Sequence, residues 1–181
     1  MESIRQNLEA EHRQVDDFVR LYCLPGLDPS LMVYDEWNTH DVLVHVLVWH
    51  ESFARNVDAL ARGLPPTPEF GRIREINDRG MAKYGDIPVR TLLRHLRRAQ
   101  RTIDDHILDN KVELIPYRVD GPSYSPAKHL EIVGGHVRLH FWDVLSVQVG
   151  GHGRPNPDGA PRNHACPDIP QQEPNKTPLA K

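Results

Sequence analysis

SPAKHLEIVGGHVRLHFWDVLSV, residues 125–147, is the stretch that decides the fold, because it has the pattern of one long helix. Ser125 suits the N-cap of such a helix, and Pro126 suits its first position. Apolar side chains then recur with the helical period, which predicts a face buried against other helices. These side chains are Leu130, Val133, Val137, Phe141, Val144 and Leu145.

Three histidines share one side of this predicted helix. His129, His136 and His140 are spaced seven and four residues apart. Side chains at i and i+4 converge, so His136 and His140 can bind one metal ion. The candidate third ligand is His45, which interrupts the apolar run of THDVLVHVLVWHESF. Neutral imidazoles suit Zn, Ni, Fe or Co, and three protein ligands leave a position open for water or substrate, as in catalytic sites.

The same residues also have simpler interpretations. The chain contains eleven histidines, so an H-x-x-x-H spacing can arise by chance. Asp41, four residues before His45, could orient its ring as part of a catalytic site or could cap the helix. Asp143, three residues after His140, could act as an acid or base or could be solvated. His129 could line a pocket or lie on the surface.

The rest of the chain predicts an all-α protein, a four-helix bundle. Amphipathic patterns and capping residues place the long helices over residues 3–23, 39–62, 88–109 and 126–147. Between the second and third of these, residues 64–87 are irregular, with room for a short helix at about residues 69–83.

The domain is expected to cover residues 1–149. Residues 150–181 are rich in Pro, Gly, Asn and Gln and cannot bury enough apolar surface to offset their ordering. We therefore expect a flexible tail, whose removal leaves fold and activity intact.

Composition narrows the class of protein. The net charge of −3 gives no general attraction to nucleic acid, and the arginines between residues 90 and 101 fit an exposed helix face. No signal peptide and no membrane span are visible. Two cysteines, Cys23 and Cys166, make no disulfide framework. These features predict a cytoplasmic protein, monomeric or homodimeric, that binds neither nucleic acid nor membrane.

The run DEWNTHDVLVHVLVWHESF resembles a segment of the DinB-like (YfiT-type) proteins, W-(S/T)-x-x-D-V-x-x-H-x-x-x-W. The residues that fall on this pattern are Trp37, Asp41, Val42, His45 and Trp49. The H-x-x-x-H of the last helix falls where that family carries its other two metal ligands. The middle of the chain, around residues 75–77 and PVRTLLRHLRRAQ, is similar to the DfsB/ClbS branch.

The resemblance implies an up-down-down-up bundle in which His45, His136 and His140 bind a divalent metal, Zn or Ni. It also implies a reaction on a small electrophilic metabolite. Members of the family transfer or isomerise with a low-molecular-weight thiol, and the ClbS branch opens a reactive ring by hydrolysis in self-resistance. Two alternatives remain: a protein that sequesters such a metabolite without turnover, and a bundle whose metal is structural or absent.

Overall fold

The structure of the protein, a computed structural model, describes residues 2–150. These residues form five helices and one short antiparallel hairpin, which confirms the predicted all-α class. The helices are α1 (Glu2–Tyr22), α2 (Thr39–Ala61), α3 (Ile73–Tyr84), α4 (Val89–His106) and α5 (Pro126–Gln148). The hairpin strands are β1 (Ile115–Pro116) and β2 (Ser123–Tyr124). The tail predicted over residues 150–181 lies, but for its first residue, outside the described residues.

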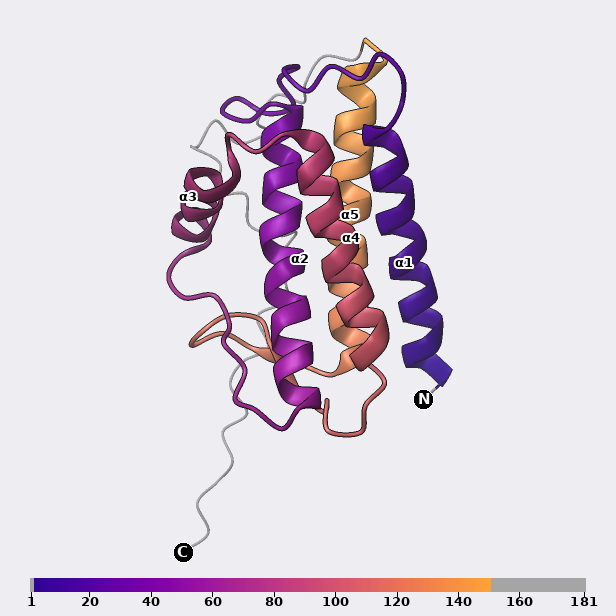
Figure 1. The fold of residues 1–181 in the computed structure, drawn as a ribbon, viewed down its shortest axis with the longest axis vertical. Coiled ribbons are helices and arrows are strands. Elements are labelled where there is room, and N and C mark those ends of the chain that lie inside the picture. The colour runs from indigo at the N-terminus through magenta and orange to yellow at the C-terminus, as the bar shows by residue number, and fades with distance from the viewer. Residues whose placement is uncertain (1, 151–181) are drawn as a thin grey trace, which may run out of the picture.

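Four of the helices form the bundle. Helices α1 and α5 run in one direction and α2 and α4 in the other, which is the up-down-down-up order (Figure 1). Helix α1 packs mainly on α5, and α2 packs mainly on α4. The fifth helix, α3, lies outside the bundle against α2, and the hairpin joins the ends of α4 and α5 (Figure 1).

The helices that carry the histidines begin at local capping signals. The Asn38 side chain accepts the backbone N–H of Asp41, and the Asp41 carboxylate accepts that of Asn38, so the two residues form a capping box for α2. Ser125 accepts the N–H of Lys128 at the start of α5, where Pro126 takes the first position. These caps fix where the two helices begin, and the apolar positions set which side of each helix faces the bundle.

Helix α3 starts four residues later than the sequence predicted. Gly71 has φ = +93°, a conformation that L side chains rarely adopt, and Arg72 becomes the N-cap. The Glu75 carboxylate then accepts the backbone N–H of Arg72 at 3.0 Å. Further along, a Cβ on Gly80 would lie 2.6 Å from a methyl group of Val48, so the missing side chain lets α3 pack closely on α2.

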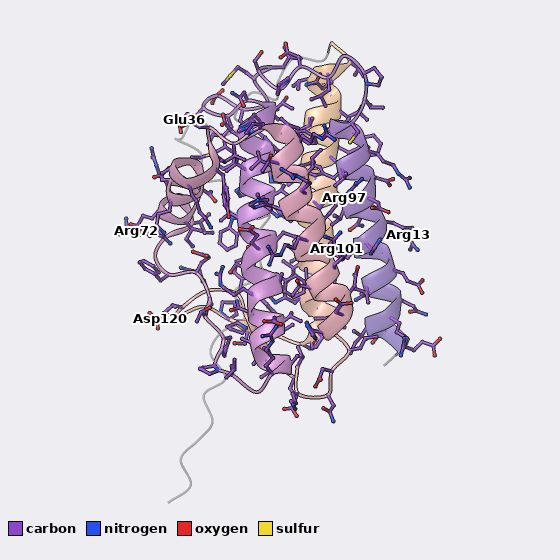
Figure 2. All side chains as sticks on the ribbon, viewed as in Figure 1. Arg13, Glu36, Arg72, Arg97, Arg101 and Asp120 are labelled. Atoms are coloured by element: carbon purple, nitrogen blue, oxygen red, sulfur yellow. The ribbon has the colours of Figure 1, made fainter. Side chains whose placement is uncertain are left out.

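The core fills the space between the four long helices, and most of the charged side chains lie outside it. Helix α2 is buried along most of its length, as its dense apolar sequence predicts. The arginines of α4 are exposed, and Figure 2 shows Arg97 and Arg101 on its outer surface. None of the helices in residues 2–150 combines the length and the apolar character that crossing a membrane requires.

Two adjacent glycines of α5 give a matched test of this packing. A Cβ on Gly134 would clash with the Gln14 side chain and lie 3.3 Å from the Cα of Glu11, whereas a Cβ on Gly135 meets nothing within 4 Å. We expect Gly135→Ala to raise the free energy of unfolding by about 1 kcal/mol through helix propensity. Gly134→Ala should lower it by about 1–2 kcal/mol through overpacking. Urea denaturation measures both, and equal effects would contradict the α1–α5 contact.

Candidate metal centre

Three imidazoles converge in the interior of the bundle. His45 comes from α2, and His136 and His140 come from successive turns of α5. The Nε2 atom of His136 lies 2.8 Å from that of His45 and 3.0 Å from that of His140. All three side chains are buried, and one nitrogen from each lies within 4.8 Å of the others. The structure thus brings together the three residues that the sequence predicted as ligands.

The ring of His45 is oriented by an amide from α3. Its Nδ1 lies 3.0 Å from Oδ1 of Asn77, and the same oxygen accepts the indole N–H of Trp49 at 3.1 Å. Indole nitrogen only donates, so the Asn77 atom that faces it must be the acceptor oxygen. His45 therefore carries its hydrogen on Nδ1, and its Nε2 presents a lone pair to the centre of the cluster.

The ring of His140 is oriented in the same way by a phenol. The Tyr34 hydroxyl donates to Oδ2 of Asp143 at 2.5 Å, so its oxygen accepts from Nδ1 of His140 at 2.9 Å. This leaves Nε2 of His140 without a hydrogen and directed at the cluster. Outer hydrogen bonds of this kind are the usual means by which proteins fix the tautomer and orientation of metal-binding histidines.

The third imidazole, that of His136, is uncharged at neutral pH. Burial lowers the pKa of His136 to about 4, with a smaller contribution in the same direction from His50. A single neutral ring has one N–H at most, so hydrogen bonds cannot satisfy both neighbouring lone pairs through Nε2 of His136. A metal cation can bind a nitrogen lone pair from each of the three imidazoles. To bind one ion at metal–nitrogen distances of about 2.0–2.1 Å, the nitrogens, which lie within 4.8 Å of one another, would need only small shifts of the rings, so the donor set fits a divalent metal.

The two aspartates predicted as catalytic have different surroundings. Asp143 is buried, and its carboxylate accepts from Tyr34 and lies 4.0 Å from Nδ1 of His140. Asp41 belongs to the capping box of α2, and the contact to Nδ1 of His45 comes from Asn77 instead. Asn77 and Tyr34 had no signal in the sequence that predicted them as neighbours of the histidines.

His129, two turns before His136 on α5, is buried and not on the surface. Its ring stacks on Phe53, with centroids 4.2 Å apart and an interplanar angle of 4°. His50, which lies on α2 one turn beyond the cluster, belongs to a separate buried network with Glu11 and Gln100.

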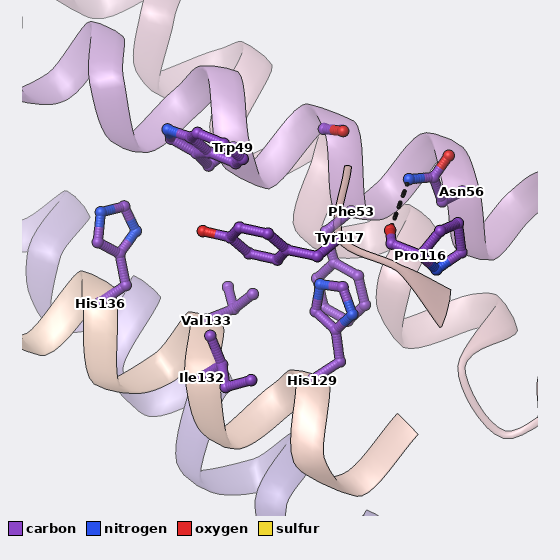
Figure 3. Close-up of a pocket in the computed structure, with 10 residues that line it drawn as sticks. Trp49, Phe53, Asn56, Pro116, Tyr117, His129, Ile132, Val133 and His136 are labelled. Carbon is purple, nitrogen blue, oxygen red and sulfur yellow. Dashed lines mark hydrogen bonds between the residues drawn. The ribbon is translucent and has the colours of Figure 1, made fainter. Parts of the chain in front are cut away.

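A narrow slot adjoins the cluster on one side. It runs between α2, β1 and α5 from His136 to His129 (Figure 3). Trp49 and Tyr117 stack in its wall with ring centroids 5.0 Å apart, and the hydroxyl of Tyr117 is directed toward His136 (Figure 3). In this conformation the enclosed part has room for about one water molecule. The slot gives the metal centre a neighbouring apolar surface on which part of a ligand can rest.

Removal of the Asn77 amide should weaken metal binding without unfolding the protein. In Asn77→Ala the imidazole of His45 loses its acceptor, and we expect about 10–100-fold weaker affinity for zinc, the usual loss for such an outer partner. Competition against a chelator dye measures this. Asn56→Ala is the control, because it removes another buried amide of the slot region that donates to Pro116 and contacts none of the three ligands. Equal losses in both variants would contradict the role given to Asn77.

The sequence matches no protein-family model and no curated protein. Two solved structures share its fold: the mycothiol-dependent maleylpyruvate isomerase and a histidine-to-alanine mutant of that enzyme. Each aligns with a TM-score of 0.62 and 11% sequence identity, over 78% of this chain and 60% of the other. The chain therefore spans less than two thirds of the length of these structures. At this identity the likeness establishes the fold, the all-α bundle expected from the DinB-like resemblance.

Proposed function

We propose that the protein is a metal-dependent enzyme that acts on a small electrophilic metabolite, and that His45, His136 and His140 hold its metal. The observation that carries this proposal is the convergence of three Nε2 atoms, two of which are kept free of hydrogen by Asn77 and Tyr34. A structural site normally has four protein ligands, whereas three leave a position for a reactant. Within residues 2–150 no fourth His, Cys, Asp or Glu joins the cluster.

When bound there, a divalent metal would lower the pKa of a coordinated water or thiol toward neutrality and so supply a nucleophile. The residues of the chain would hold the metal ligands in position and hold a proton near the metal. Asn77 and Tyr34 hold the rings of His45 and His140, and the buried Tyr34–Asp143 pair holds a proton next to the centre. We assign Asp143 the role of proton acceptor through Tyr34. For Asp41 the contacts support helix capping only.

Thiol transfer is the favoured reaction class, with hydrolytic ring opening as the second. The support for a thiol is that two solved structures with this fold are of a mycothiol-dependent enzyme. The support for hydrolysis is the similarity of residues 75–77 and of the α4 sequence to the DfsB/ClbS branch, which stays a prediction. In either case we expect a small-molecule substrate, a zinc or nickel ion and, for transfer, a low-molecular-weight thiol.

The test is turnover by zinc-, nickel- and cobalt-loaded protein. Maleylpyruvate, an epoxide and an activated cyclopropane would each be offered with mycothiol, with glutathione and without thiol. Multiple turnovers with any pair, lost in His45→Ala, support the enzyme. Consumption that stops at one equivalent per protein would favour the sequestering protein. Full metal occupancy with no reaction and no binding of any of the three electrophiles would favour a structural metal.

A further inference from the structure

His129, one of the residues that line the slot, has a buried nitrogen without a hydrogen-bond partner. Nδ1 of His129 has none among the described residues, and the side chain is only 2% exposed. Stacking on Phe53 fixes the plane of the ring, and the hydrogen bond of the ring to the backbone of Ile115 opposes a flip within that plane. A buried acceptor left without a donor is destabilising, so a ligand or water that donates to it gains affinity.

The hydrogen-bond partner of the other ring nitrogen determines whether Nδ1 is a donor or an acceptor. The ring donates a hydrogen bond to the backbone carbonyl of Ile115. Because Nδ1 is the unpartnered atom, the donor is Nε2, which therefore carries the hydrogen. Burial lowers the pKa of His129 to about 4, so the ring is neutral at pH 7. Nδ1 therefore presents a lone pair and needs a donor.

The walls of the slot exclude a charged group. Its lining contains no lysine and no arginine, and most of its surface is aromatic or aliphatic, from Trp49, Phe53, Ile132 and Val133. A carboxylate placed there would lose its hydration and meet a lone pair in place of a cation. The narrow space admits a hydroxyl or an N–H group.

We propose that this slot is a specificity subsite that receives an uncharged hydrogen-bond-donating end of the substrate, a hydroxyl or amide, on Nδ1 of His129. The subsite lies seven residues from His136, about 10 Å along α5, so it can hold the end of a ligand whose other end is at the metal centre. In that respect the proposal deepens the proposed function. His129, the residue that accepts the hydrogen bond, is not one of the three metal ligands.

The first test needs no metal. In metal-free protein labelled with ¹⁵N, the Nδ1 resonance of His129 is followed during titration with 1-pentanol and with butyl methyl ether, which has the same length but no donor. We expect the alcohol to shift this resonance upfield and the ether to leave it in place. Equal responses to the two probes, or none to the alcohol, would overturn the subsite whatever the metal centre does.

The second test uses probes with one end for the metal centre and the other for the subsite. Three hydroxamates with a five-carbon chain that ends in a hydroxyl, a methyl ether or a carboxylate are titrated into the zinc-loaded protein by calorimetry. We expect the hydroxyl probe to bind about tenfold more tightly than the ether, the value of one hydrogen bond, and the carboxylate to bind most weakly. In His129→Phe, which keeps an aromatic ring against Phe53, the hydroxyl and ether probes should become equal.

The outcomes separate the two proposals. If zinc is taken up and all three probes bind equally, the subsite is wrong and the metal centre stands. If no zinc is taken up, the proposed function fails and the ¹⁵N titration alone decides the subsite. Should His129→Phe not fold, His129→Leu takes its place, because leucine has no hydrogen-bond acceptor. A hydroxyl preference that survives the loss of the histidine would overturn the assignment.

Discussion

His136→Ala is expected to abolish stoichiometric metal binding, because His136 is the ligand that faces both other imidazoles. Four-ligand zinc sites bind with apparent free energies of about 10–16 kcal/mol, so one ligand accounts for roughly 3–4 kcal/mol. The affinity should then fall by about 100–1000-fold. Mass spectrometry under native conditions and a chelator competition give the stoichiometry and the constant.

The wild type should also gain thermal stability from zinc or nickel, and the variant should not. A ligand that binds only the folded state stabilises by about 4 kcal/mol at a thousandfold excess over its Kd. His40→Ala is the matched control, because His40 is a histidine of the same α2 helix whose Nε2 contacts the carbonyl of Ile87 and no ligand. Metal binding retained in His136→Ala and lost in His40→Ala would refute the site.

Most of the fold could be predicted from the sequence because its determinants are local. The four stripes of apolar side chains and the caps at Asn38 and Ser125 act within one or two turns. The histidine cluster was predictable for the same reason, since His136 and His140 are one turn apart and His45 interrupts an apolar run. Because the three histidines occupy fixed positions along two helices, few arrangements of those helices could bring them together.

The partners of the histidines could not be predicted in this way. Asn77 reaches His45 because α3 packs closely on α2 at Gly80, a tertiary contact with no periodic signal in the sequence. Tyr34 comes from a loop, where periodicity gives no phase. Asp41 shows the converse ambiguity, since a carboxylate one turn before a histidine fits helix capping and ring orientation equally well in the sequence, and in the structure Asn77 contacts His45.

The buried network of α1, α2 and α4 also escaped prediction. Glu11 lies in the charged sequence EAEHRQ, yet its side chain is only 1% exposed. Its carboxyl group accepts from Gln100, whose amide oxygen contacts His50 at 2.7 Å and whose nitrogen also donates to Asp104. Burial raises the pKa of Glu11 from its usual 4.5 to about 8, and the hydrogen bond from Gln100 only partly offsets this. The folded protein thus keeps Glu11 protonated at neutral pH.

The second large effect is therefore expected of Glu11→Gln, which makes the uncharged state permanent. Between pH 4.5 and 8 the folded state holds a proton that the unfolded chain releases, so stability is complete below pH 4.5 and falls as pH rises toward 8. Each pH unit in that interval is worth about 1.4 kcal/mol. Glutamine does not titrate, so at pH 7 the variant should be more stable than the wild type by roughly 3 kcal/mol.

The dependence of the free energy of unfolding on pH distinguishes the loss of a titrating carboxyl group from a change in packing. His50, His129 and His136 have pKa values lowered to about 4 by burial, so they contribute a rise in stability between pH 4 and 6.5 and almost nothing above pH 7. From pH 7 to 8.5 the wild type should lose about 1 kcal/mol, and Glu11→Gln should stay level. Urea denaturation of metal-free protein at four pH values measures both curves. Parallel curves would show that Glu11 is already ionised in the folded state, and a variant less stable than the wild type at pH 8 would show that the carboxylate is needed there.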